Sequence, residues 1–158
     1  MSLNTQYLGK TLKSPIVVAA SPLAKEINNI KKMETNGAGA VVLSSLFEER
    51  IRAEAQEMDD RLNAATPNFS ESESFFPQIH EYRFGPDQYL SHIEAAKKAV
   101  DIPIIASLNG STPGGWTDYA RKIEGAGADA LELNIYAVPT DASLSGDELE
   151  KSHLEIVK

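Results

Sequence analysis

The sequence predicts an α/β fold in which four parallel βα units form the amino-terminal half of a (β/α)8, or TIM, barrel. Three observations lead to this prediction. Short apolar segments alternate along the chain with segments of helical periodicity. Polar residues follow each apolar segment at the point where a strand would end. The chain has 158 residues, and a complete barrel takes about 250, so four units of this size are half of one.

Two βα units are predicted in the first third of the chain. Residues 15–20 form an apolar strand that ends at Ser21-Pro22. The apolar residues that follow recur at helical spacing, namely Ile27, Ile30 and Met33. Asn36-Gly37 closes this helix, and the second strand, near 40–44, ends at Ser44-Ser45.

A segment of different composition follows the second strand. Residues 47–62 are rich in charged side chains and are expected to be helical at least in part. Residues 66–86 are rich in Ser, Pro and aromatic residues. Such a long segment is either a surface excursion or a lid over the strand ends, and both alternatives stay open. We therefore treat about 47–86 as an insertion into one partial domain that spans 1–158.

The third and fourth units follow the insertion. A helix over 88–100 leads to a strand at 102–108, and an amphipathic helix around Trp116 to Ile123 leads to a strand at 130–136. Strands joined by a helical crossover are almost always parallel neighbours. The fourth helix begins with a capping box of Ser145 and Glu148, and its inward residues are expected to be Leu149, Ile156 and Val157.

The tetrapeptide Gly-Ala-Gly-Ala occurs at 37–40 and again at 125–128, each time between a helix and a strand. A glycine at such a place adopts the left-handed backbone conformation that ends a helix. We expect Gly37 and Gly125 to end the two helices, so the repeat has a structural meaning.

A doubly wound domain of the flavodoxin type, a self-sufficient binding domain, also fits this chain length. The two folds differ in the order of their strands. A half barrel has the order 1-2-3-4, whereas a flavodoxin-type sheet has the order 2-1-3-4. Strand one lying between strands two and three would exclude the half barrel.

The composition limits the classes of partner. A net charge of -8 argues against nucleic acid, and the absence of cysteine excludes thiolate metal sites and a cysteine nucleophile. The three histidines have no metal-ligand spacing, and no apolar run could span a bilayer or act as a signal peptide. We expect a soluble cytoplasmic domain that binds a small molecule and no metal or membrane.

Small and polar residues gather at the predicted strand ends, where ligands bind in parallel sheets. They are Ala20, Ser21, Ser44, Ser45, Ser107, Asn109, Asn134 and Tyr136. By alternation, Glu132, Asn134 and Tyr136 share one face of the fourth strand, which would point into the barrel. A buried amide needs hydrogen-bond partners, so Asn134 is favoured as a ligand-binding residue over packing filler.

Four segments at these strand ends resemble the dihydroorotate dehydrogenase family, and most closely its dihydroorotate dehydrogenase-like branch. They are IVVAASPLA, GAVVLSSLFEE, IIASLNGSTPGGW and ADALELNIYAVPT. The resemblance covers most of the chain outside the insertion and corresponds to the first half of the barrel. It implies an FMN-dependent oxidoreductase of pyrimidine biosynthesis that acts on the CH–CH bond of a dihydropyrimidine, and it is compatible with a homodimer.

The resemblance also assigns roles to individual residues. The FMN-binding residues would be Ala20, Ser21, Ser44, Ser45 and Asn134, with Asn109 and Asn134 contacting the substrate. The flavin ring is flat, largely apolar and edged with carbonyls and nitrogens, which suits small polar partners. The Asn134 amide both donates and accepts hydrogen bonds, as a pyrimidine requires.

Three departures from the family pattern weaken the case for catalysis. Ser44 stands where the family has a lysine, and Ala137 stands where the cytosolic enzymes have their catalytic cysteine. Thr140 and Ser143 are the available hydroxyl replacements for that base. The family's substrate loop is replaced by FFPQIHEYRFGP. A non-catalytic or decayed flavin-barrel paralogue therefore stays open as an alternative.

Two further classes of barrel enzyme are less favoured by the residues. A flavin barrel that acts on tRNA would need basic patches, and an aldolase or isomerase barrel would need an inward lysine at a strand end. The FMN phosphate site normally lies after strands seven and eight, so we expect it beyond Lys158. We also expect the 158-residue chain alone to be inactive, because two open sheet edges favour association over a closed site.

Overall fold

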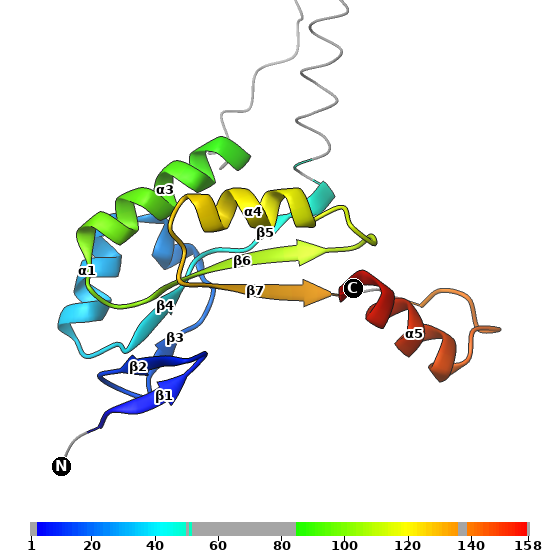
Figure 1. The fold of residues 1–158 in the computed structure, drawn as a ribbon, viewed down its shortest axis with the longest axis horizontal. Helices are drawn as coiled ribbons and strands as arrows, with labels where there is room; N and C mark the ends of the chain where they lie inside the picture. Colours follow the sequence, from blue (N-terminus) through cyan, green and yellow to red (C-terminus); the bar gives the residue numbers. More distant parts are fainter. Residues whose placement is uncertain (1–2, 50, 52–84, 136–138, 158) are drawn as a thin grey trace, which may run out of the picture.

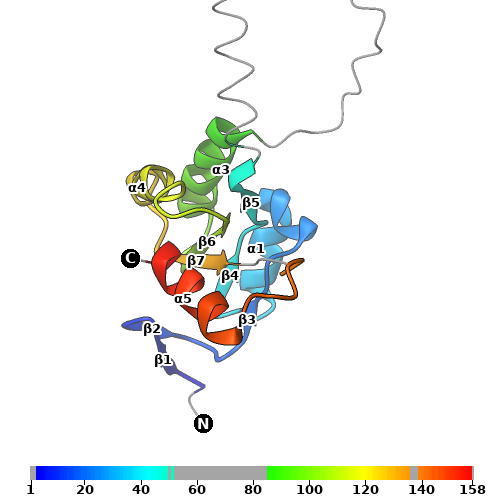
Figure 2. The same cartoon turned by 90° about the vertical axis from the view of Figure 1, so that its right-hand side faces the viewer.

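The computed structural model describes residues 3–49, 51, 85–135 and 139–157. A parallel sheet forms its centre, and helices cover one face of that sheet (Figures 1 and 2). The strands of the sheet are β3 (Val17–Val18), β4 (Ala40–Val42), β5 (Leu46–Phe47), β6 (Ile104–Gly110) and β7 (Ala130–Ile135). The helices are α1 (Ile27–Thr35), α3 (Pro86–Ala99), α4 (Thr117–Gly125) and α5 (Gly146–Val157), with a short 3-10 helix, η1 (Pro22–Lys25).

The order of the main strands is β3-β4-β6-β7, which confirms the sequential order predicted for a half barrel. Val17 pairs with Ala40, Val41 with Ile104, and Ile105 with Ala130, all in parallel. The first strand lies at an edge and not between the second and third. The flavodoxin alternative is therefore wrong, because it requires the first strand in the interior of the sheet.

A bulge interrupts the strand beside β6. Both β4 and β5 pair with the same edge of β6, with Val42 opposite Ile105 and Leu46 opposite Leu108. Three residues, 43–45, therefore lie opposite only two, 106–107. Such a bulge redirects side chains and leaves part of the ladder unpaired. It places Ser44 and Ser45 at the carboxyl end of the sheet, and the sequence analysis did not predict β5.

Strand alternation separates an apolar layer from a mixed layer. On β6, Ile104, Ala106 and Leu108 face the helices in a core completed by residues such as Ile30, Ile93 and Ile123. Burying each such side chain contributes about 1.5–3 kcal/mol. We call the opposite face the inner face. Its amino-terminal part is apolar, with Ala40, Val42 and Ile105 packed against Leu12.

A short hairpin covers the amino-terminal part of the inner face (Figure 2). It consists of β1 (Thr5–Tyr7) and β2 (Lys10–Leu12), and its turn places Leu8 and Gly9 at positive φ. Asp129 holds the hairpin to the helix layer, because one carboxylate oxygen lies 3.0 Å from Lys10 Nζ and the other 2.6 Å from Lys97 Nζ. The backbone N–H of Ile104 also donates to Asp129 at 2.8 Å.

Two details of the helix ends differ from the predictions. Gly125 is the last residue of α4, and Gly127 has the positive φ of 90°. The structural equivalent of Gly37, with φ of 93°, is thus Gly127, and the two Gly-Ala-Gly-Ala copies are offset by two residues. The prediction for Gly125 was wrong because the left-handed glycine follows the end of the helix. Gly37 and Gly127 each lie two residues after the last helical residue, whereas Gly125 is itself that residue.

The capping box of α5 is confirmed, since Ser145 Oγ donates to Glu148 Oε2 at 2.8 Å and accepts from the Glu148 N–H at 3.3 Å. Of its predicted inward residues, Ile156 is buried and Leu149 is half-buried, but Val157 is 57% exposed. That last prediction was wrong because Val157 is the final residue of the helix, where no neighbour covers it.

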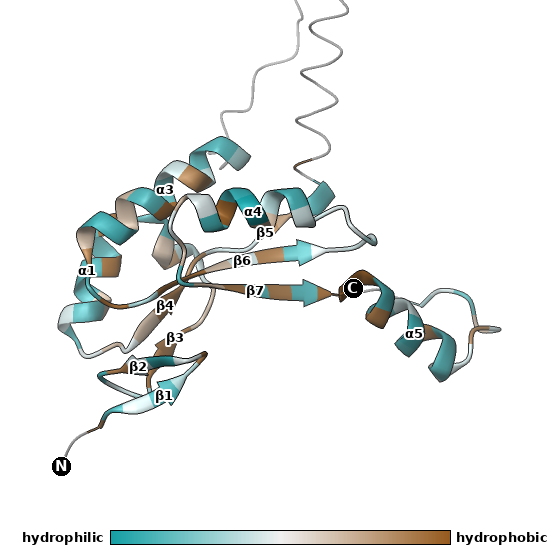
Figure 3. Cartoon of the chain, viewed as in Figure 1, coloured by the Kyte–Doolittle hydropathy of each residue, from teal (hydrophilic) through white to brown (hydrophobic). Residues whose placement is uncertain are grey.

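Most of the predicted insertion lies outside the described residues, which resume at residue 85. In the part of the chain that the structure describes, no helix has the length and apolar character needed to cross a bilayer. The hydropathy of the sheet is uneven. Figure 3 shows β3 and β4 as apolar, whereas hydrophilic residues interrupt β6 and β7.

Candidate functional site

Four polar side chains form one hydrogen-bonded group on the inner face, near the carboxyl end of the sheet. We call it the polar cluster, and its members are Ser45, Ser107, Glu132 and Asn134. Ser107 Oγ lies 2.8 Å from Ser45 Oγ and donates to Glu132 Oε1 at 2.8 Å. Asn134 Nδ2 donates to Ser107 Oγ at 3.2 Å and to Glu132 Oε1 at 3.3 Å.

The strand register brings these residues together. Ser107 lies directly opposite Glu132, and Asn109 lies opposite Asn134, in the parallel pair of β6 and β7. Residues two apart on a strand share a face, so Glu132 and Asn134 both face Ser107. The bulge after β4 brings Ser45 to the same point from the other side. The structure therefore joins Asn134 and Ser45, which were predicted from strand ends far apart in the chain.

The hydrogen-bond directions in the cluster can be assigned. A hydroxyl has one hydrogen to donate, and Ser107 Oγ gives its hydrogen to the carboxylate of Glu132. Ser45 must then be the donor in its bond to Ser107. The Asn134 amide nitrogen also donates inward, and within the described ranges no donor reaches its Oδ1. Asn134 Oδ1 is thus an acceptor oxygen that receives no hydrogen bond from the described residues, and such an oxygen suits the N–H group of a ring imide.

Tyr89 supports the cluster from the helix side of the sheet. Its hydroxyl accepts from the backbone N–H of Ser107 at 2.9 Å and donates to the Ser107 carbonyl at 3.2 Å. The side chain is 3% exposed, and burial raises the pKa of Tyr89 to about 12. The hydrogen bond to Ser107 lowers this pKa and the charge of Glu132 raises it, to smaller extents. Tyr89 is therefore neutral at any ordinary pH.

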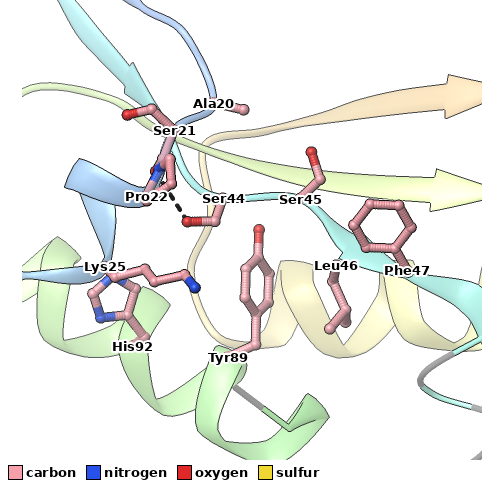
Figure 4. A pocket seen from close by; sticks show the side chains of 10 residues that line it. All are labelled: Ala20, Ser21, Pro22, Lys25, Ser44, Ser45, Leu46, Phe47, Tyr89 and His92. Atoms are coloured by element: carbon pink, nitrogen blue, oxygen red, sulfur yellow. Dashed lines mark hydrogen bonds between the residues drawn. The ribbon is translucent and has the colours of Figure 1, made fainter. Parts of the chain in front are cut away.

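A cavity of about 470 Å³ lies beside the cluster, at the carboxyl ends of β3 and β4 (Figure 4). Four of the predicted cofactor-binding residues line it together, namely Ala20, Ser21, Ser44 and Ser45. The other lining residues are Pro22, Lys25, Leu46, Phe47, Tyr89 and His92. Ser44 Oγ donates to the backbone carbonyl of Ser21 at 3.1 Å. Cavities of 300–1,000 Å³ with few polar groups are typical of small-molecule and cofactor sites.

Comparison with curated proteins identifies relatives of this chain. The dihydroorotate dehydrogenase B (NAD(+)), catalytic subunit, of Methanocella arvoryzae is 32% identical over 135 residues, which cover 85% of this chain and 41% of that protein. The corresponding subunit of Thermoplasma acidophilum is 27% identical over 134 residues, covering 84% and 41%. The chain is related to the dihydroorotate dehydrogenases. It spans about two fifths of the length of these curated relatives.

Two further comparisons provide no support for any particular fold family or function. No model of a protein family matches the sequence. Among solved structures, the carboxyl transferase domain of Rhizobium etli pyruvate carboxylase with pyruvate superposes with a TM-score of 0.39 at 11% identity, over 76% of this chain and 17% of that chain.

The remaining predicted residues of this dihydroorotate dehydrogenase relative are placed as follows. Asn109 is half-buried on the inner face beside Asn134. Thr140 and Ser143 are exposed, and the Ser143 hydroxyl donates to Asp141 at 2.6 Å in a local turn. The structure thus places neither hydroxyl in the polar cluster. Tyr136 and Ala137 lie outside the described residues.

The sequence analysis missed Glu48, although it is one of the most buried side chains. Glu48 is 0% exposed, and its carboxylate accepts the backbone N–H groups of Ser111 and Thr112 at 2.7 and 3.1 Å. The hydroxyls of the same two residues also donate to it. Glu48 therefore fixes the loop after β6 at the edge of the site. The sequence carried no signal for this burial, because a glutamate at the start of a charged segment is ordinarily exposed.

Among the histidines, His92 and His153 each pair with a backbone carbonyl, of Ala24 and of Leu149, at 2.8 Å. His80 lies outside the described residues. No group of three or more potential metal ligands occurs among the residues with described positions.

Proposed function

We propose that this chain supplies the first four βα units of an FMN-dependent oxidoreductase that resembles dihydroorotate dehydrogenase and acts on the CH–CH bond of a dihydropyrimidine. The polar cluster is the observation that carries the proposal. It gathers Ser45 and Asn134 at the ligand-binding end of a parallel sheet, and Ser45 also lines the neighbouring cavity. The relation to named dihydroorotate dehydrogenases supports the same reading.

The residues around the cavity fit a flavin ring. Ala20 contributes a small apolar surface to the cavity, and Ser21, Ser44 and Ser45 line it as well. Among the described residues, no group bonds to Ser21 Oγ, which is itself buried, so that hydroxyl lacks the partner that buried polar groups normally have. Asn134 Oδ1 would accept from a ring N–H. When bound, FMN would supply the acceptor for the hydride removed from the substrate.

A non-catalytic flavin-binding paralogue is the second candidate. It is favoured by Ala137, whose methyl group cannot accept a proton where the resemblance places the catalytic cysteine. The exposed positions of Thr140 and Ser143 favour it as well, because neither hydroxyl belongs to the polar cluster. Under this candidate, FMN binds but dihydroorotate is not oxidised.

A chimera separates the two candidates. This chain would replace the aligned 135 residues of the Methanocella arvoryzae protein, and the unaltered relative serves as the control. The first candidate predicts that the purified chimera retains FMN and forms orotate, at a reduced rate because Ala137 replaces the base, whereas the second predicts that it retains FMN and forms no orotate. A colourless, well-folded chimera would refute flavin binding by this half, because the other half is supplied by the relative.

The Ala137→Cys substitution in the same chimera tests the missing base. A thiol at this position should raise the rate of dihydroorotate oxidation above that of the parent chimera if only the base is missing. If Thr140 or Ser143 serves instead, Ala137→Cys should change little and the double variant Thr140→Val, Ser143→Ala should abolish turnover. A parent rate equal to that of the relative would exclude the non-catalytic paralogue.

A further inference from the structure

The edge of β6 that faces β4 and β5 has one unpaired position. In a parallel strand, the N–H and C=O groups of every second residue point to the same neighbour. The Ile105 carbonyl accepts the N–H of Leu43 at 2.9 Å, and Asn109 lies opposite Phe47 of β5. Ser107, midway between them, points its N–H and C=O at the bulge formed by residues 43–45. No strand residue pairs with it there, because the bulge removes the ladder at this step.

The Tyr89 hydroxyl occupies this position. It makes both hydrogen bonds that a neighbouring strand would have made to Ser107, accepting from the N–H at 2.9 Å and donating to the C=O at 3.2 Å. In Figure 4 the tyrosine ring rises from α3, and its hydroxyl lies between Ser44 and Ser45 of the bulge. A buried N–H or C=O left without a hydrogen-bond partner is destabilising, and the Tyr89 hydroxyl supplies the partner for both groups of Ser107.

The same residue, Ser107, is the centre of the polar cluster. Its side chain is 0% exposed and is bonded to Ser45, Glu132 and Asn134 on the inner face. Fixing the Ser107 backbone from the helix side therefore fixes where its Oγ meets the three other polar groups. We propose that Tyr89 is the positioning residue of the polar cluster: its hydroxyl replaces the missing strand partner of Ser107 and thereby sets the ligand-facing oxygens of Ser45 and Asn134.

This role differs from ordinary core packing. The ring of Tyr89 belongs to the helix-facing core with Ile93 and Ala96, and a phenylalanine would fill the same space. The hydroxyl adds two hydrogen bonds to the sheet backbone that a phenylalanine could not make. Because burial raises the pKa of Tyr89 to about 12, the hydroxyl keeps its proton and can donate and accept at once. The inference goes beyond the proposed flavin function, since it concerns the geometry of the cluster whatever ligand binds.

The test compares Tyr89→Phe with Tyr119→Phe. Tyr119 is a matched control, because it is 4% exposed and its hydroxyl also donates to a backbone carbonyl, that of Pro86, away from the cluster. Two NMR signals are measured in the full chain without ligand: the hydrogen exchange rate of the Ser107 amide and the chemical shift of the Asn134 side-chain amide. We expect Tyr89→Phe to speed exchange at least tenfold and to move the Asn134 signal, and Tyr119→Phe to do neither.

An Asn134 signal that stays in place in a folded Tyr89→Phe variant would overturn the proposal, even if stability falls. If the Tyr89→Phe variant does not fold, the proposal is tested in the wild-type chain instead. A slowly exchanging Tyr89 hydroxyl proton with a nuclear Overhauser effect to the Ser107 amide is then expected, and its absence would overturn the proposal.

A double-mutant cycle with FMN as probe tests whether Tyr89 acts through Ser107. We expect Tyr89→Phe to weaken FMN binding by the chimera about tenfold in the otherwise unaltered background and to have little effect in the Ser107→Ala background. Equal losses in both backgrounds would refute the coupling. If the parent chimera binds no FMN at all, the proposed function fails, whereas the ligand-free NMR measurements still decide the role of Tyr89.

Discussion

The two ends of the sheet each contain a carboxylate largely removed from water, but they use it differently. At the amino end, Asp129 binds the ammonium groups of Lys10 and Lys97 and closes the hairpin over the sheet. At the carboxyl end, Glu48 receives hydrogen bonds from the neutral N–H and hydroxyl groups of Ser111 and Thr112. The amino end satisfies its polar groups internally. The carboxyl end fixes the loop after β6 and holds the polar cluster, of which Ser45 lines the cavity. This is expected of the functional end of a parallel sheet.

The largest effect is expected from Glu48→Ala. Removing a fully buried carboxylate leaves two backbone N–H groups of the loop after β6 without an acceptor, which should lower the free energy of unfolding by about 3 kcal/mol. Urea unfolding followed by circular dichroism measures this change. Glu49→Ala is the control. Glu49 is the exposed neighbour of Glu48, so its substitution should change the free energy of unfolding by less than about 0.5 kcal/mol. Equal effects of the two substitutions would contradict the role of Glu48.

Asp129→Asn should cost less, about 2 kcal/mol at neutral pH, because one acceptor oxygen is retained. Burial alone would raise the pKa of Asp129, but hydrogen bonds from Lys97, the Ile104 N–H and Lys10 outweigh it and hold the pKa below the ordinary 3.8. The stabilisation is therefore present above the unfolded pKa and is lost as the pH falls through the lower folded pKa.

The stability difference between wild type and Asp129→Asn should therefore shrink when unfolding is measured at about pH 3 instead of pH 7. A difference that grows on acidification would mean that the carboxyl group is bound in its protonated form. The hairpin would then be held by something other than the two lysines.

Asn134→Ala tests the ligand-binding character of the carboxyl end. It removes the acceptor Oδ1 and the two inward hydrogen bonds to Ser107 and Glu132, so FMN binding by the chimera should weaken about tenfold, as for one lost hydrogen bond. Quenching of flavin fluorescence measures the affinity. Ser143→Ala, at an exposed turn, should leave it unchanged. Equal affinities of wild type and Asn134→Ala would remove Asn134 from the site.

The smallest effect concerns the turn that leads into Asp129 at the amino end. Gly127→Ala should destabilise the chain by about 1 kcal/mol, because φ of 90° is strained for alanine. Gly125→Ala lies inside α4, where a methyl group meets no atom within 4 Å, and should stabilise by about 0.5 kcal/mol. Thermal unfolding of the two variants compares them. The reverse order would restore Gly125 as the residue that ends the helix.

Some of this organisation was predictable from the sequence. Long apolar segments identified β6 and β7, and helical crossovers between parallel strands fixed their order. Strand alternation also placed Glu132 and Asn134 on one face. These features depend on local periodicity and on general rules of chain connection, which a single sequence contains.

Other features depend on contacts between distant segments. β5 has two residues, too few for any periodic signal, yet it creates the bulge that brings Ser45 to Ser107. Tyr89 was predicted only as an apolar helix residue, because its hydroxyl gains a role when the bulge leaves Ser107 unpaired. Glu48 looked like a member of a charged, solvated segment until the loop after β6 enclosed it.

The most direct test of the functional assignment maps FMN binding onto the two ends of the sheet. Backbone amide chemical shifts of the flavin-depleted chimera with the Methanocella arvoryzae protein would be followed by NMR during titration with FMN. We predict changes at Ser21, Ser45, Ser107 and Asn134, around the cavity and the polar cluster, and none at Lys10 or Asp129. Changes confined to the amino end, or none at saturating FMN, would contradict the account.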